Sequence, residues 1–233
     1  MKKIAAIILV LILLLSFCGC NSTKLTSKNL VGSWETEISV EVYSAISDDD
    51  LSAKFTENDI PKSLANEIGA LKLKTIFEFD KGKGNLKIPE EAVKNFSQET
   101  IGIIIDYYKN GGLLKAVQEQ GIEINTNEEL DEIYKEEGTS IDAILTEMRA
   151  KMEKVINDNS DDLMTGQLVD GYYPLYEIKP KYRIDEDTVI FYDSYDEYET
   201  FYFEIIDNDT LKINKIYYNY EEFNVSMTLK RVK

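Results

Sequence analysis

The sequence predicts an α+β fold in which an antiparallel β-barrel, or a strongly curved meander, is interrupted by an insertion of several helices. Segments before residue 89 and after residue 166 alternate apolar and polar side chains, as half-buried strands do. Between them, apolar residues recur at helical spacing. Short turns rich in Asp, Asn and Gly join the expected strands, which favours an antiparallel meander. Closure into a barrel would remove the exposed edges of such a sheet.

The amino-terminal half begins with a strand that we expect over residues 32–43, where Trp34 and Ile38 share the apolar face. Residues 48–69 are expected to form one or two short helices that end at Gly69. A second strand is expected at 71–80, and the glycines of "KGKG" then allow a tight turn into a return strand.

The helical insertion is expected to span residues 89–164. Pro89 precedes two glutamates, which is a favoured helix start, and Gly111-Gly112 is expected to end this first helix. Thr126 and Glu129 have the spacing of a capping box. A further helix follows Gly138, and its apolar residues recur at helical spacing: Ile141, Ile144, Leu145, Met148, Met152, Val155 and Ile156.

The carboxy-terminal part returns to a period of two, with turns predicted at 185–188 and 207–210. Eleven of the fifteen tyrosines lie between residues 172 and 220, which fits ordinary strand composition as well as a ligand-binding surface. About eight strands are expected in total.

The amino terminus has the pattern of a secretory signal over residues 1–19, because a short basic start precedes an apolar run that is too short to span a membrane. The sequence "FCGC" resembles the lipobox of bacterial lipoproteins, in which a small residue precedes the lipidated cysteine. This resemblance implies lipid attachment at Cys20 and a lipidated tether over residues 20–29. The barrel domain would then comprise residues 30–233.

The expected location is the outer face of the cytoplasmic membrane, with the amino-terminal lipid as the contact to the membrane. Arginine is rare relative to Lys, Ile, Asn and Glu, which suggests a low-GC Gram-positive bacterium. The net charge is −17, and it becomes −19 once Lys2 and Lys3 leave with the signal, since 24 basic and 43 acidic residues remain. A surface of this sign excludes nucleic acid as a partner.

The composition also argues against catalysis. The chain has no histidine, and its two cysteines are Cys18 and Cys20, which excludes the usual Ser-His and Cys-His mechanisms and the common zinc sites. The acidic clusters at 48–50, 161–162 and 185–187 lack the glycine of a calcium loop and are interpreted as solvated loops. We therefore expect no enzyme activity, no metal and no cofactor.

Two motifs suggest a family. "LVGSWETE" is similar to the Gly-x-Trp opening of lipocalin-like barrels, with Gly32 and Trp34 at the matching positions. The ending "DNDTLKINKI…MTLKRVK" is similar to the last hairpin of lipocalin-like bacterial lipoproteins. The resemblance covers roughly residues 30–88 and 166–233. It implies that Trp34 packs across the closed end of the barrel against Arg231 near the end of the last strand.

These observations predict a non-catalytic surface lipoprotein that binds a small apolar ligand or a protein of the cell envelope. The ligand pocket would be lined by Phe77, Phe79, Phe201 or Phe203, with the helical insertion as a lid over the barrel opening. In the alternative arrangement, the insertion is a bundle beside the barrel. The alternative function is a structural or interaction module with a filled barrel, and a carboxylate-dependent wall or glycan hydrolase ranks below it.

Overall fold

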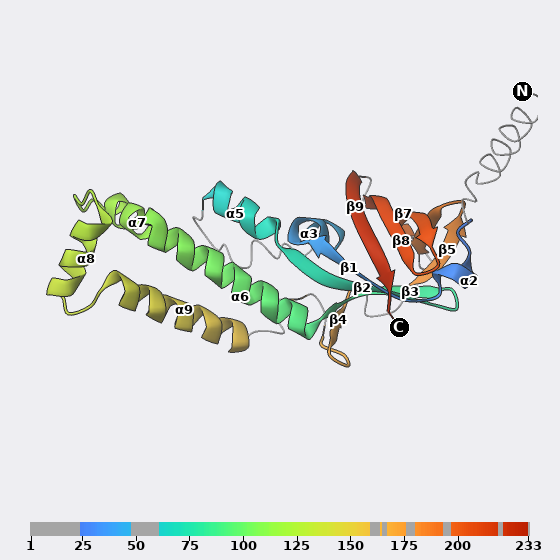
Figure 1. The fold of residues 1–233 in the computed structure, drawn as a ribbon, viewed down its shortest axis with the longest axis horizontal. Helices are drawn as coiled ribbons and strands as arrows, with labels where there is room; N and C mark the ends of the chain where they lie inside the picture. The colour runs from blue at the N-terminus through green and yellow to red at the C-terminus, as the bar shows by residue number, and fades with distance from the viewer. Residues whose placement is uncertain are drawn as a thin grey trace, which may run out of the picture.

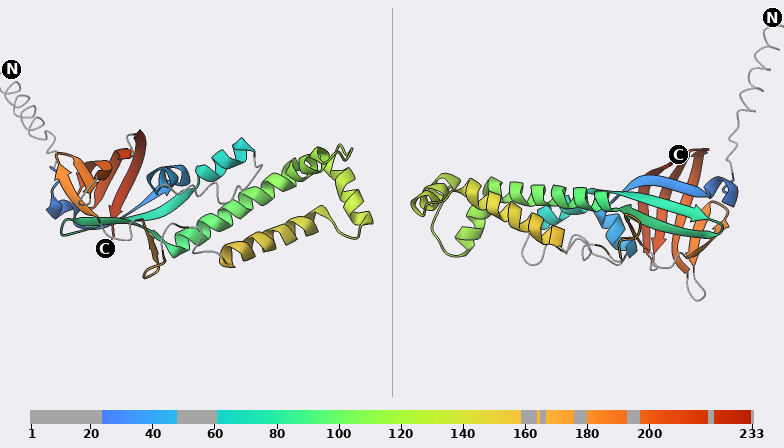
Figure 2. Two further views of the ribbon diagram at one scale, coloured as in Figure 1. Left: turned by 180° about the vertical axis from the view of Figure 1, so that it is seen from behind. Right: turned by 90° about the horizontal axis from the view of Figure 1, so that it is seen from below.

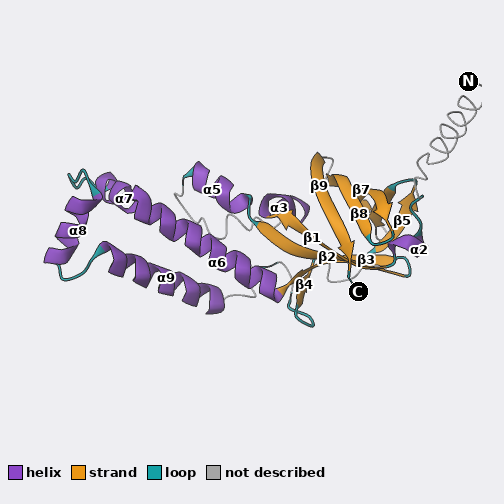
Figure 3. Cartoon of the chain, viewed as in Figure 1, coloured by secondary structure: helices purple, strands orange, loops and turns teal. Residues whose placement is uncertain are grey.

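The computed structural model describes residues 24–47, 61–158, 164, 167–175, 180–192, 197–218 and 221–232. The signal segment, Cys20 and the acidic clusters at 48–50 and 161–162 lie outside the described residues. Figure 1 shows the fold, and Figure 3 shows that most helices lie on one side of the strands.

Eight antiparallel strands form a closed barrel, which is compatible with a lipocalin-like fold. Each strand pairs with its neighbours in the order β2-β1-β9-β8-β7-β6-β5-β3, and pairing of β2 with β3 completes the circle. The short β4 extends β3 on its other edge. The strand bounds are β1 Gly32–Ser39, β2 Lys72–Asp80, β3 Lys83–Pro89, β4 Tyr172–Pro174, β5 Lys181–Asp185, β6 Thr188–Tyr192, β7 Glu197–Asp207, β8 Thr210–Tyr218 and β9 Glu221–Arg231.

The helices precede β1, follow β1 and fill the long connection between β3 and β4. Their bounds are α2 Ser27–Leu30, α3 Val40–Ser47, α5 Lys62–Gly69, α6 Glu90–Tyr107, the π-helical η1 Tyr108–Gly112, α7 Leu113–Glu119, α8 Asn127–Glu136 and α9 Ile141–Asp158. The capping residue predicted for α8 is present, because the hydroxyl of Thr126 accepts a hydrogen bond from the backbone N–H of Glu129 at 3.1 Å.

The first strand is shorter than the sequence predicts. It ends at Ser39, and the chain turns directly into α3 at Val40. The Ser39 hydroxyl accepts a hydrogen bond from the backbone N–H of Val42, as a helix-capping serine does. Tyr43 and Ile46 of α3 are buried in the main core, so tertiary packing outweighs the strand-like alternation of this segment.

The tether predicted at residues 20–29 is too long, because its described part belongs to the folded domain. Leu25, just before the short helix α2, is 5% exposed, and Leu30, the last residue of α2, is fully buried. The side chain of Asn29 accepts a hydrogen bond from the backbone N–H of Thr26, which fixes the turn into α2. The folded domain therefore begins closer to Cys20 than the sequence indicates.

The helical insertion forms an arm that extends away from the barrel (Figures 1 and 2). Only its base joins the barrel: Ala92, Val93 and Phe96 of α6 belong to the main core cluster, and α6 contacts β2 and β3. Further out, α6 and α9 pack on each other around a second cluster of Ile101, Ile105 and Leu145. The predicted lid is thus wrong for most of the insertion, because its apolar stripe is buried within the arm itself.

The predicted helix end at Gly111-Gly112 is a kink rather than a stop. Gly111 has a positive φ of 111°, which favours glycine, and Gly112 packs so closely on the Tyr107 ring that a side chain would collide with it. The chain passes through η1 and continues into α7, in agreement with the usual association of π-turns with helix kinks.

Candidate functional site

The barrel interior is filled with aromatic side chains. The four phenylalanines predicted to line a pocket are each no more than 3% exposed and lie in contact with one another: Phe77, Phe79, Phe201 and Phe203. The rings of Phe77 and Phe201 meet edge-to-face at 5.4 Å between centroids, and Phe79 stacks with Phe191 at 5.9 Å. These contacts are those of a packed core, which agrees with the filled-barrel alternative.

One end of the barrel is closed by the pair that the resemblance to lipocalin-like proteins implies. Trp34 and Arg231 are partners in the β1–β9 register, and the guanidinium carbon lies 4.0 Å from the centroid of the Trp34 ring. The indole N–H donates to the carbonyl of Leu30 at 2.7 Å. The guanidinium donates to the carbonyls of Asn29, Val31 and Asn208, at 2.7, 2.8 and 3.1 Å. Arg231 thus ties α2, β9 and the β7–β8 turn together.

The glycine of the Gly-x-Trp motif has a direct physical role. Gly32 has a φ of 130°, and a β-carbon at this position would lie 2.7 Å from Nη1 of Arg231. Both facts favour glycine at this position, because a side chain would strain the backbone and would displace the end of the guanidinium from its hydrogen bond to the Val31 carbonyl.

A groove opens where β1 and β9 separate. The two strands pair only through Trp34 with Arg231 and Glu35 with Lys230. Beyond these two pairs, β1 remains paired with β2, and β9 remains paired with β8. The groove between them has a volume of 380 Å³ and is lined by Glu35, Thr36, Glu37, Lys74, Ser226, Met227, Thr228 and Lys230. We call it the β1–β9 seam.

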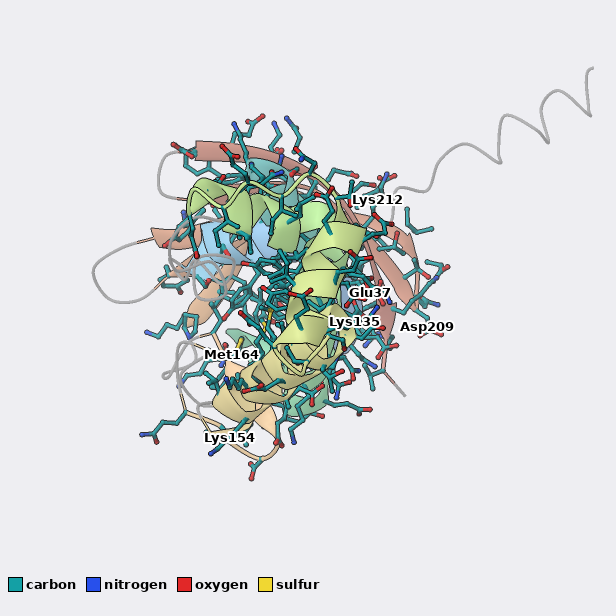
Figure 4. All side chains as sticks on the ribbon, turned by 90° about the vertical axis from the view of Figure 1, so that its left-hand side faces the viewer. Glu37, Lys135, Lys154, Met164, Asp209 and Lys212 are labelled. Atoms are coloured by element: carbon teal, nitrogen blue, oxygen red, sulfur yellow. The ribbon has the colours of Figure 1, made fainter. Side chains whose placement is uncertain are left out.

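Two glutamates and two lysines line the seam, and of these Glu35 and Lys74 are in direct contact. Lys74 bonds to Glu35 at 2.8 Å, and this hydrogen bond raises the pKa of the Lys74 ammonium. Lys230 donates to the hydroxyl of Thr210 at 2.7 Å. Glu37 is exposed and has no ion pair within the described residues. Figure 4 shows Glu37 on the same side of the barrel as Asp209 and Lys212.

A second, smaller groove lies on the arm. It has a volume of 260 Å³ and is lined by residues of α9 alone: Ile144, Glu147, Met148, Lys151 and Met152. Its apolar residues are half-buried, because α9 packs on a single neighbouring helix along most of its length. The charges at its rim are already paired, since Lys151 contacts Glu147 at 2.6 Å.

The described residues form a polar groove between β1 and β9. Within the described ranges, no group of three or more acidic side chains is placed to hold a metal ion. No helix of the described part of the chain is long and apolar enough to cross a membrane. The sequence interpretation did not find the seam, because the residues that line it come from strands nearly 200 positions apart and give no local signal.

Comparison of the chain with models of protein families, with curated proteins and with solved structures finds no match. A function must therefore be inferred from the fold and from the two grooves described above.

Proposed function

We propose that this protein is a non-catalytic lipoprotein, anchored by Cys20 outside the cytoplasmic membrane, whose barrel domain binds a protein partner. The packed aromatic interior of the barrel favours a protein partner over a small apolar ligand. A ligand site inside a barrel needs a cavity of some hundreds of Å³. The residues predicted to line it fill the interior instead, with Phe77 and Phe79 both in contact with Phe203.

The position of the amino terminus supports the anchored arrangement. Leu25 is buried beside α2, and α2 lies at the end of the barrel opposite the arm (Figure 1). The five residues from Cys20 to Leu25 can span at most about 18 Å. A lipid on Cys20 would hold this end of the barrel close to the membrane, with the arm directed away from it.

The net charge of −17 also fits this arrangement. An acidic surface is repelled by anionic lipid headgroups, so the domain would stand off the membrane rather than lie on it. A lipid anchor is then needed to keep the protein at the membrane, and two acyl chains supply stable attachment.

The anchor is tested by mass spectrometry and fractionation of cells that produce the full-length protein. We expect a mature amino terminus at Cys20 that carries acyl chains, and we expect Cys20→Ala to leave the membrane fraction. Cys18→Ala is the matched control and should leave anchoring unchanged. An intact Met1 in the membrane fraction, or retention of the Cys20→Ala protein, would refute the anchor.

The binding function is tested by two measurements on the same protein. Titration with an environment-sensitive apolar dye should show no saturable site, because the interior is packed. Chemical crosslinking through lysine side chains, in cells that produce the protein, should give one discrete adduct that an excess of the purified soluble domain prevents. A saturable dye site without such an adduct would favour the small apolar ligand instead.

A further inference from the structure

The β1–β9 seam exposes the backbone edge of a long strand. β9 runs from Glu221 to Arg231, and only its last two positions pair with β1. Residues 221–229 are paired with β8 alone within the described part of the chain. In an antiparallel strand, alternate residues direct their N–H and C=O groups to each side, so a row of these groups faces the seam.

Part of this edge lacks the charged residues and prolines with which proteins often protect a free strand. Residues 223–229 read "FNVSMTL" and contain neither a charged residue nor a proline. The register shift in the β8–β9 pair places Val225 and Ser226 of β9 opposite Asn214 of β8, so β9 carries one bulge in this stretch. On either side of the bulge, the uncharged edge remains a template for the addition of a strand.

The side chains at the seam define what such a strand would look like. On the inner face, Met227 and Leu229 are buried, whereas Phe223 and Val225 are only half-buried. On the outer face, β9 presents Asn224, Ser226, Thr228 and Lys230. Across the groove, β1 presents Glu35, which is paired with Lys74, and Glu37, which has no ion pair within the described residues. A complementary segment therefore has apolar residues at alternate positions facing inward and basic residues between them facing outward.

We propose that the β1–β9 seam binds an extended segment of a partner protein, with alternating apolar and basic residues, as an additional strand on β9. This inference rests on the proposed partner-binding function and names the site and the chemistry of the partner. The free edge supplies main-chain hydrogen bonds, and Glu37 supplies the charge that selects a basic segment. A second copy of this chain fits less well, because each copy carries a net charge of −17.

The test uses the soluble mature domain and a fluorescent heptapeptide in which Lys and Val alternate. A peptide of the same composition with all Lys before all Val is the first control, because it has equal charge without the alternation. A peptide with N-methyl groups on alternate residues is the second, because it cannot donate the hydrogen bonds of a strand. Fluorescence anisotropy should show binding of the alternating peptide about 10-fold tighter than of either control.

Variants of the domain locate the binding. Ser226→Lys places a charge on the exposed β9 edge and should weaken binding of the alternating peptide about 10-fold. Ser226→Thr should leave this affinity unchanged. Glu37→Lys should weaken it by a similar factor through like-charge repulsion. Glu204→Lys on β7 makes the same charge change at an exposed position outside the seam and should have less than about a 2-fold effect. Circular dichroism confirms that each variant is folded.

The possible outcomes separate this inference from the proposed function. Equal binding of the three peptides would show non-specific charge attraction and overturn strand addition. A concentration-dependent dimer that Ser226→Lys abolishes would overturn it in favour of a second copy. A crosslinked partner in cells that survives Ser226→Lys would leave the partner-binding function intact and place it elsewhere on the protein.

Discussion

The closure of the barrel by Arg231 can be tested by the change Arg231→Met, which keeps a long apolar side chain but removes the guanidinium. The change deletes three hydrogen bonds to backbone carbonyls and the contact of the guanidinium with the Trp34 ring. Each hydrogen bond contributes about 0.5–1.5 kcal/mol, and the cation–π contact about 0.5–2 kcal/mol. Because the side chain is 25% exposed, water can replace some of these bonds, and we expect a loss of roughly 2–3 kcal/mol.

The assays are urea unfolding of the mature soluble domain, which gives the free energy of unfolding, and thermal unfolding, which gives Tm, both followed by circular dichroism. A loss of this size should lower Tm by about 4–12 °C in a domain of this length. Arg183→Met is the matched control: Arg183 lies on β5, is exposed, and has its guanidinium carbon 5.9 Å from the Tyr192 ring. Its loss should change the free energy of unfolding by less than about 0.5–1 kcal/mol.

Arg231→Lys separates the contribution of the positive charge from that of the hydrogen bonds of the guanidinium. Lysine keeps the positive charge and part of the cation–π contact but cannot reach several carbonyls with one planar group. We expect it to recover less than half of the loss. If the free energy of unfolding of Arg231→Met is within 0.5 kcal/mol of that of the unchanged protein, the contacts of Arg231 contribute nothing measurable to stability. The packing of α2 on β1 must then hold this end of the barrel instead.

Three further predictions concern stability. Gly32→Ala should destabilise the domain by at least about 1 kcal/mol, because of its positive φ and the guanidinium beside it, whereas Gly102→Ala in the open middle of α6 should be neutral or stabilising in the same unfolding assay. Leu145→Ala should speed hydrogen exchange of arm amides and leave barrel amides unchanged, because the second cluster is confined to the arm. The hydrogen bond from the backbone N–H of Asp209 holds the pKa of the Asp207 carboxyl below its ordinary value. The stabilisation of the folded turn is present above the unfolded-state pKa and is lost as pH falls through the lowered folded-state pKa. Asp207→Asn should therefore reduce the pH dependence of the stability of the β7–β8 turn in the acid range, as followed by NMR.

The features that could be predicted are those that depend on neighbouring residues. Alternation at 71–80 predicts β2 because one face of a barrel strand is buried and the other is exposed, so Phe77 and Phe79 point inward. The capping contact at Thr126 involves residues three positions apart. The pairing of Trp34 with Arg231 is long-range, and it was predicted only because the two motifs resemble a known arrangement.

The features that were missed depend on tertiary contacts. Residues 40–43 alternate as a strand does, but the core accepts Tyr43 from a helix, and α3 forms. The direction of the arm depends on the contacts of α6 with β2 and β3 at its base and on packing of α9 on α6, neither of which can be read from the local pattern. The amphipathic stripe of α9 shows that this helix is partly buried but does not show against which element.

The path of β1 bears on both the core and the open side of the barrel. β1 separates from β9 after Glu35 while it remains paired with β2 as far as Ser39, and its turn into α3 at Val40 then leaves residues 221–225 of β9 with no β1 strand to pair with. The turn also brings Tyr43 and Ile46 into the main core cluster. A barrel altered in this way has less room for a ligand inside and more free backbone at its edge, because a strand that leaves the sheet early removes hydrogen-bonding partners from the one beside it. Restoring the pairing by lengthening β1 at the expense of α3 should therefore reduce both partner binding at the seam and the packing of the core.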